Sequence, residues 1–145
     1  MTGLDFDISE TQGKIYEYAA RRSYDMDSFS DNYLKSDFCM RAMDSSYSRF
    51  QLADEEECWD FIAPEIEKDC KKLDEGAMFD PAVAFWIGFM YRYICRQTGI
   101  RSNVLRKYVS YPVMCQYYPG LHTIDEDNAV EIVKKDFIPA DESDG

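Results

Sequence analysis

The sequence is poor in histidine, glycine and proline, and it lacks the common catalytic motifs. Its 145 residues include one histidine, seven glycines and five prolines. It contains no glycine-rich phosphate loop, no HExxH motif, no paired-cysteine zinc signature and no nucleophile elbow. These absences argue against the enzyme classes that depend on such motifs. We therefore predict no catalytic residue, no metal site and no cofactor.

Cysteine is present but unpaired in the sequence. There are five cysteines, and they are widely spaced: Cys39, Cys58, Cys70, Cys95 and Cys115. An odd number without close pairs fits neither a disulfide framework nor a zinc knuckle. We expect reduced thiols that are mostly buried.

Strand signals and long apolar runs are also missing. No segment alternates apolar and polar residues over a strand's length, and no apolar run reaches the roughly 20 residues that a bilayer requires. The chain opens with a short acidic segment rather than a basic region followed by an apolar one, so no signal peptide is expected. These features predict an all-α, cytoplasmic protein without a membrane span.

Residues 80–98 form the segment around which the chain is expected to fold. Asp80 can cap a helix, Pro81 suits its first position, and Gly99 can close its end in a left-handed conformation. The intervening residues are apolar on almost every side, which is typical of a helix at the centre of a core. The glycine within it, Gly88, should allow a second helix to approach closely.

Capping and periodicity signals predict further helices on both sides of this segment. They cover about 9–24, 27–46 as one bent helix or two short ones, 54–64 with a helical face continuing to 76, a short helix capped by Ser102, 112–119, and a last helix capped by Asp125. The domain prediction is one compact multi-helix domain over 1–138, followed by an acidic disordered tail over 139–145.

Charge is distributed unevenly along the chain. The net charge is −12, yet residues 81–124 contain no Asp or Glu, five basic residues, six of the eleven tyrosines and the only histidine. Two interpretations stay open. The basic residues either pair with carboxylates of the flanking helices or form a surface for an anionic ligand or acidic partner. The overall negative charge disfavours a nucleic-acid ligand.

Within that window, two arginines and several aromatic residues make the one candidate binding site. A guanidinium group can hold a carboxylate or phosphate, and tyrosine rings offer stacking surfaces, so the set could bind a nucleotide or an acidic peptide. The alternative, which we favour, is a buried polar network in which at least one arginine pairs with a carboxylate from residues 1–80 or 125–136. The candidate residues are Tyr91, Arg92, Tyr93, Arg96, Tyr117, Tyr118 and His122.

Cys115 and His122 are a candidate catalytic pair. His122 could activate Cys115, with Asp125 orienting the imidazole ring. However, Cys115 follows Met114 in an apolar helix, where a free thiol is usually a small core residue. His122 is more simply explained as a loop histidine that bonds the nearby backbone.

The order of several short motifs resembles that of a known family. The motifs are Phe85-Trp86-Ile87-Gly88, Tyr91-Arg92-Tyr93, Thr98-Gly99, His122-Thr123, and a final helix with Ala129 and Val130. Together they are similar to a family of small uncharacterised bacterial proteins encoded in toxin–antitoxin-like cassettes, beside genes for ADP-ribosyltransferase-type toxins. The resemblance implies a role in such a cassette and transfers no site residue.

The leading functional hypothesis is therefore a non-enzymatic, protein-binding module. It would be an antitoxin-like or accessory component whose partner is a toxin encoded nearby. The second hypothesis is a small enzyme or nucleotide-binding protein that uses the tyrosine and arginine cluster with His122. The oligomeric state stays open, and the presence of any catalytic activity is left open with it.

Overall fold

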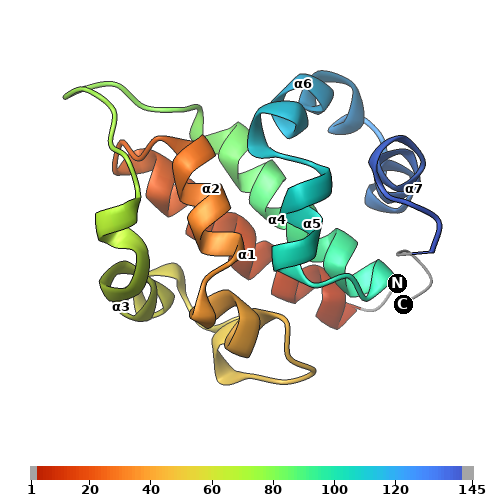
Figure 1. The fold of residues 1–145 in the computed structure, drawn as a ribbon, viewed down its shortest axis with the longest axis horizontal. Helices are drawn as coiled ribbons and strands as arrows, with labels where there is room; N and C mark the ends of the chain where they lie inside the picture. Colours follow the sequence, from red (N-terminus) through yellow and green to blue (C-terminus); the bar gives the residue numbers. More distant parts are fainter. Residues whose placement is uncertain (1–2, 142–145) are drawn as a thin grey trace.

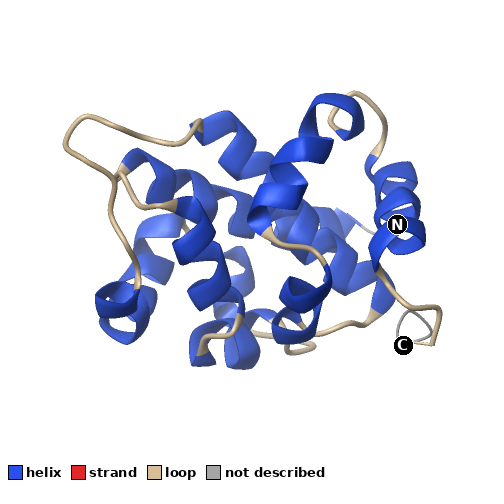
Figure 2. Cartoon of the chain, turned by 45° about the horizontal axis from the view of Figure 1, so that its top comes forward, coloured by secondary structure: helices blue, strands red, loops and turns tan. Residues whose placement is uncertain are grey.

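The computed structural model describes residues 3–141, which form helices joined by loops (Figure 1). Among these residues no strand occurs (Figure 2). One isolated β-bridge joins Tyr24 to Lys72. The all-α prediction is therefore confirmed. The α-helices are α1 (Gly3–Arg21), α2 (Met26–Leu34), α3 (Glu55–Ile66), α4 (Pro81–Thr98), α5 (Ser102–Tyr108), α6 (Tyr111–Leu121) and α7 (Glu126–Phe137), with short helical turns η1 (Cys39–Met43), η2 (Arg49–Leu52) and η3 (Glu67–Asp69).

Helices α1 and α4 pack extensively against each other at the centre of the molecule. In Figure 1 they lie side by side, with α2 and α5 in front of them. A Cβ atom placed on Gly88 would lie 2.5 Å from Cγ of Tyr16, so these helices approach too closely for any side chain there. The Gln12 side chain also donates a hydrogen bond to the Gly88 carbonyl over 3.0 Å. The expected close approach at Gly88 is confirmed.

The ends of α4 follow the sequence signals. The Asp80 carboxylate accepts hydrogen bonds from the backbone N–H groups of Ala82 and Val83. At the other end, Gly99 has φ of 77° and donates to the Cys95 carbonyl. Because local capping groups satisfy the free backbone groups at both ends, the limits of this helix could be predicted without tertiary contacts.

Helix α1 begins earlier than predicted. It starts at Gly3 instead of Ser9, and it ends at Arg21. The Ser9 hydroxyl donates to the Asp5 carbonyl 2.7 Å away, one helical turn earlier, instead of capping a new helix. Ser9 is therefore an interior residue of α1.

The helical face predicted to continue to residue 76 is wrong, because the chain turns away after η3. The Lys71 carbonyl accepts a hydrogen bond from Asp25, and Leu73 donates to the Ser23 carbonyl. Ser28 accepts from the Lys71 backbone N–H in the same region. These backbone groups therefore bond to the α1–α2 connection, which is distant in sequence and leaves no local signal.

Helix α6 passes through the residues where it was predicted to stop. Pro119 lies inside the helix, which continues to Leu121. Proline lacks the N–H that would bond to residue 115, so one hydrogen bond is lost near the end of the helix. The lost hydrogen bond affects only the last turn, and the helix continues for two residues after Pro119.

The other helix predictions are confirmed in outline, with one exception. Ser102 is the first residue of α5 and not its cap, because Arg101 is at the cap position and the Ser102 hydroxyl donates to Asp44 instead. The segment 27–46 forms two short pieces, α2 and the π-helical turn η1, and the Ser36 hydroxyl accepts from the Cys39 backbone N–H between them. Asp54 and Asp125 cap α3 and α7 as expected. The predicted tail, 139–145, lies partly outside the described residues. Within 3–141, every helix is too short or too polar to cross a membrane.

Candidate functional site

The most extensive buried polar network is centred on Arg92 of α4. Its side chain is 1% exposed, yet the guanidinium group has four hydrogen-bond partners. Nη1 donates to Asp44 over 2.7 Å, and Nη2 donates to the Ser102 hydroxyl over 2.7 Å. Nε donates to Gln12 over 3.1 Å, and Nη2 also lies 3.1 Å from the Cys39 sulfur. Nearly all of the donors of this arginine are therefore used inside the protein.

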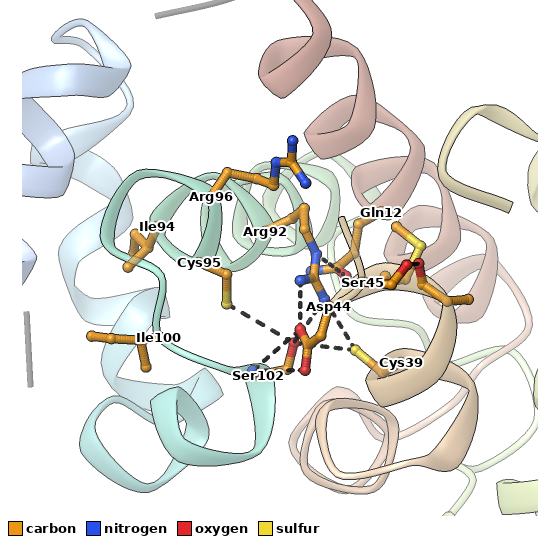
Figure 3. A network of polar contacts seen from close by, with 12 residues as sticks. Gln12, Cys39, Asp44, Ser45, Arg92, Ile94, Cys95, Arg96, Ile100 and Ser102 are labelled. Atoms are coloured by element: carbon orange, nitrogen blue, oxygen red, sulfur yellow. Dashed lines mark hydrogen bonds and ion pairs between the residues drawn. The ribbon is translucent and has the colours of Figure 1, made fainter. Parts of the chain in front are cut away.

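The partners of Arg92 come from separate parts of the chain. Figure 3 shows the Arg92 side chain directed at Asp44 and Ser102, with Cys39 and Cys95 on opposite sides. Asp44 follows η1, and Ser102 begins α5. The Ser102 hydroxyl donates to Asp44 over 2.6 Å, and its backbone N–H also donates to that carboxylate. The network thus joins α1, η1, α4 and α5.

Asp44 supplies the charge that balances Arg92. Burial raises the pKa of the Cys39 thiol to about 11 and that of the Cys95 thiol to about 12, so both are neutral at pH 7. Burial alone would lower the pKa of Arg92, but the two thiols, which are charged only at high pH, and the Asp44 carboxylate raise it above its ordinary value. The Arg92 and Asp44 side chains, 1% and 8% exposed, therefore form a buried ion pair.

The second arginine of the predicted site also has a carboxylate partner. Arg96 Nε donates to Asp5 of α1 over 2.9 Å, with side chains 21% and 18% exposed. Gln97 donates to the other oxygen of the same carboxylate. In Figure 3 the Arg96 side chain is directed away from Asp44. The prediction that at least one arginine pairs with a carboxylate from residues 1–80 is thus confirmed for both.

A cavity of about 260 Å³ lies beside this network. Arg92, Arg96 and the exposed Arg101 contribute to its lining, together with Asp44. Such a cavity could admit a small anion. However, Asp44 and Asp5 already balance two of the three arginines, so the attraction for an anion is reduced to the contribution of Arg101.

Three tyrosines of the predicted site donate hydrogen bonds to other residues of the protein. Tyr91 donates to the Val109 carbonyl over 2.8 Å, and Tyr93 donates to Asp127 over 2.6 Å. Tyr117 donates to Asp136 over 2.9 Å. Tyr91 and Tyr93 are buried, so their rings contribute to the core. These bonds connect α4 to α5 and α7, and α6 to α7.

Tyr118 and His122 lie together at the end of α6. Their rings are stacked, with centroids 4.2 Å apart, and the Tyr118 ring also meets Trp86 edge to face. His122 Nδ1 is 2.6 Å from the Tyr118 carbonyl oxygen, which confirms that the histidine bonds the nearby backbone. Among the described residues, no hydrogen bond or ring contact joins Tyr118 or His122 to Arg92 or Arg96.

Cys115 does not have the environment of an activated thiol. It is half-buried on α6, and burial followed by the nearby charge of Asp27 raises its pKa. A catalytic cysteine needs a lowered pKa, because the thiolate is the nucleophile. No hydrogen bond connects Cys115 with His122 in residues 3–141. In the same residues no group of three or more potential metal ligands occurs.

An apolar groove that sequence reasoning missed lies between η1, η2 and α3. Its volume is about 320 Å³, and its apolar floor is made by Phe38, Ala42, Phe50 and Phe61. The Phe50 ring meets Phe38 and Phe61 edge to face, with centroids 5.4 and 4.8 Å away. We call residues 37–65, which contain this groove, the 37–65 surface.

The same stretch of chain contains several exposed apolar side chains. Tyr47 is 82% exposed and Leu52 is 61% exposed, while Phe61 and Met40 are 51% and 42% exposed. A contiguous exposed apolar patch often marks a binding site. The Phe and Tyr residues of 38–61 could have indicated this surface, but their exposure depends on the fold and not on a local motif.

The partners of Arg92 were also missed as a set. Gln12, Asp44 and Ser102 are far apart in sequence, and only the packing of α1 on α4 brings them together. The one available signal was the presence of two charged residues on an otherwise apolar helix, which require partners when they are buried.

Comparison of the chain with protein-family models, with curated protein sequences and with solved structures gives no match. The resemblance to the toxin–antitoxin-like cassette family therefore stays a hypothesis.

Proposed function

We propose that this protein acts by binding a partner protein with a basic surface, through the 37–65 surface. The observation that supports this most directly is an apolar groove in a stretch of chain that also exposes Tyr47, Leu52 and Phe61. Exposed aromatic and aliphatic side chains of this kind serve as anchors when a partner covers them, and anchors carry most of the binding energy in an interface.

The charge of the same stretch indicates the chemistry of the partner. Residues 37–65 contain eight acidic and two basic side chains. One of the acids, Asp44, is used internally by Arg92. The first turn of α3 presents three glutamates, of which one pairs with Arg49. An apolar groove with acidic surroundings complements a basic protein surface with an apolar centre, and it repels other acidic proteins.

The resemblance of the short motifs to a family from toxin–antitoxin-like cassettes supports a partner of this kind. If the chain belongs to a toxin–antitoxin-like cassette, the partner is a toxin encoded by a neighbouring gene, and this protein is its antitoxin-like or accessory component. No enzymatic activity is required of the protein itself. The clustered arginines fit this proposal as supports of the fold, because both have carboxylate partners.

The proposal is tested by co-expression of the full chain with each protein encoded beside it. We expect one neighbour to co-purify, and growth to be restored if that neighbour is toxic. Tyr47→Ser and Leu52→Ser should weaken the complex, because they remove apolar anchors from the 37–65 surface. Both side chains are largely exposed, so the folded state should keep its stability.

Met78→Ser and Ile124→Ser are matched controls, since these exposed apolar residues lie outside the 37–65 surface. They should leave the complex intact. The proposal is wrong if no neighbour binds, or if the controls weaken the complex as much as the variants of the 37–65 surface. Turnover of a nucleotide by the purified protein, abolished by His122→Ala, would replace it with the enzyme hypothesis.

A further inference from the structure

A third cavity lies between α2 and the connection from α5 to α6. Its volume is about 240 Å³, somewhat below the range of sites for drug-sized ligands. Carboxylates, aromatic rings and apolar side chains line it together. Its lining includes Asp27, Asp31, Leu34, Arg106, Tyr111 and Pro112.

Tyr111 has a buried hydroxyl without a hydrogen-bond partner. The residue is 3% exposed, and among the described residues nothing accepts from or donates to its hydroxyl. The ring is held in place by stacking on Tyr16 and by an edge-to-face contact with Phe79. A buried hydroxyl left unpaired is costly, so a tyrosine here is less favourable for folding than a phenylalanine would be.

Other core tyrosines show that this arrangement is unusual for the molecule. The Tyr16 hydroxyl bonds to Ser30, and Tyr33 donates to Gln12. Tyr91, which lines the same cavity as Tyr111, donates to the Val109 carbonyl. Tyr111 thus lines this cavity and has a buried hydroxyl without a partner among the described residues.

The electrostatic environment of the cavity favours a cation. Asp31 is bonded by Arg106 at 2.9 Å and approached by Lys35 at 3.5 Å. Within residues 3–141 no hydrogen bond or ion pair engages the Asp27 carboxylate, while its own backbone N–H donates to Asp25. Asp27 is exposed and lines the same cavity as Tyr111, so it brings an unpaired negative charge to the cavity.

We propose that this cavity binds a primary alkylammonium group, with the ammonium held by the Asp27 carboxylate and the Tyr111 hydroxyl. The ammonium has three N–H donors, which match the two oxygen acceptors, and a carbon chain of a few atoms suits the apolar side chains of Leu34 and Pro112. The group belongs either to a free small amine or to a lysine side chain of a bound protein. The inference does not depend on the proposed function.

The test is a titration of the full chain with n-propylammonium chloride, followed by two-dimensional NMR of the backbone amides. We expect saturable shifts confined to residues 27–34 and 106–112, at millimolar concentrations. Sodium propionate and 1-propanol have the same carbon chain without the positive charge, and they should cause no saturable shift. A parallel titration with Nα-acetyl-lysine-N-methylamide separates the two sources, because a lysine site binds it more tightly than propylammonium and a small-amine site excludes it.

Two variants test the named groups. Asp27→Asn should weaken propylammonium binding roughly tenfold or more, because it removes the charge and keeps the size of the side chain. Tyr111→Phe should weaken it several-fold while the protein unfolds at the same or a higher urea concentration, since an unpaired hydroxyl is removed. The urea concentration at which the protein unfolds separates a ligand contact of Tyr111 from a structural role.

Asp60→Asn and Tyr47→Phe are the matched controls, because both residues are exposed and lie outside the cavity. They should bind propylammonium like the wild type. The inference is overturned if no saturable shift occurs up to about 0.1 M amine, if propionate binds equally, or if Asp27→Asn and Tyr111→Phe bind as tightly as the controls.

Discussion

At the scale of single residues, Arg92 is the side chain on which several elements depend. A charged group placed in a core costs free energy unless its charge and its donors are matched. Asp44 matches the charge, and Ser102 and Gln12 accept further donors. The network therefore defines how α1, η1 and α5 are positioned on α4, beyond what apolar packing alone specifies.

Arg92→Met should strongly destabilise the protein, because it leaves the Asp44 carboxylate buried without its cation. We expect a loss of roughly 3–5 kcal/mol in the free energy of unfolding, measured by urea denaturation. Combining it with Asp44→Leu should recover much of this loss. Arg96→Met is the control and should cost about 1 kcal/mol, because its pair with Asp5 is partly exposed. A cost for Arg92→Met as small as that of the control would show that the network is not a support of the fold.

The buried thiols make stability sensitive to alkaline pH. Burial raises the pKa of Cys39 from 9.0 to about 11 and that of Cys95 to about 12. In the folded state these thiols keep their protons, whereas unfolded thiols lose them above about pH 9. Their contribution to stability is therefore complete below pH 9, and it is lost as the pH rises through about 11.

The expected result is a melting temperature that falls progressively between about pH 9 and 11. Cys95→Ala should reduce the slope, because one of the groups with a raised pKa is removed. Exposed Asp60→Asn should leave it unchanged. A melting temperature that stays constant over this interval would contradict the burial of these thiols.

At the scale of elements, the contact between α1 and α4 depends on a glycine. A Cβ on Gly88 would come within 2.5 Å of Cγ and 2.7 Å of Cβ of Tyr16. The Tyr16 ring cannot retreat easily, because it contacts Phe29 and Tyr33 edge to face. The absence of a side chain at residue 88 thus permits the central helix pair to form.

Gly88→Ala should destabilise the protein by about 1–3 kcal/mol, although alanine favours a helix over glycine by up to about 1 kcal/mol. Gly120→Ala is the matched control, since no atom lies within 4 Å of a Cβ placed there. It should be neutral or slightly stabilising. Thermal unfolding of both variants measures the difference, and an equal effect of the two substitutions would show that α1 and α4 are not in close contact at Gly88.

The elements that the sequence predicted well are those with local causes. Asp54, Asp80 and Asp125 cap helices because their carboxylates reach backbone N–H groups two or three residues away. The segment after η3 was predicted wrongly, because its backbone bonds to the distant residues 23–28. The candidate site was likewise predictable only in part. The need for partners of Arg92 and Arg96 was visible in the sequence, whereas the identity of Asp44 depends on the fold.

At the scale of the whole molecule, the uneven charge has a structural explanation. Arg92, Arg96 and Arg106 from the basic window pair with Asp44, Asp5 and Asp31 from the acidic first half. The interpretation that the basic residues pair with carboxylates of the flanking segments is therefore confirmed for these three arginines. The remaining acidic side chains, those of 37–65 among them, keep the surface of the molecule negative.

If the partner is basic, its association should depend on salt. Raising the salt concentration from about 0.05 to 0.5 M should slow association more than it speeds dissociation, because screening acts on long-range attraction between exposed charges. Replacing Glu55 and Glu56 in the first turn of α3 by glutamine should flatten this dependence. Surface plasmon resonance gives both rates, and an association rate that does not change with salt would exclude an electrostatic role for the acidic residues.

The central claim is that the 37–65 surface, and not the end of α6, is the interface. Hydrogen–deuterium exchange of the isolated complex and of the free protein tests it most directly. The account predicts slower exchange in residues 38–61 when the partner is bound, with unchanged exchange in residues 117–122. Protection of residues 117–122, with no change in residues 38–61, would contradict it.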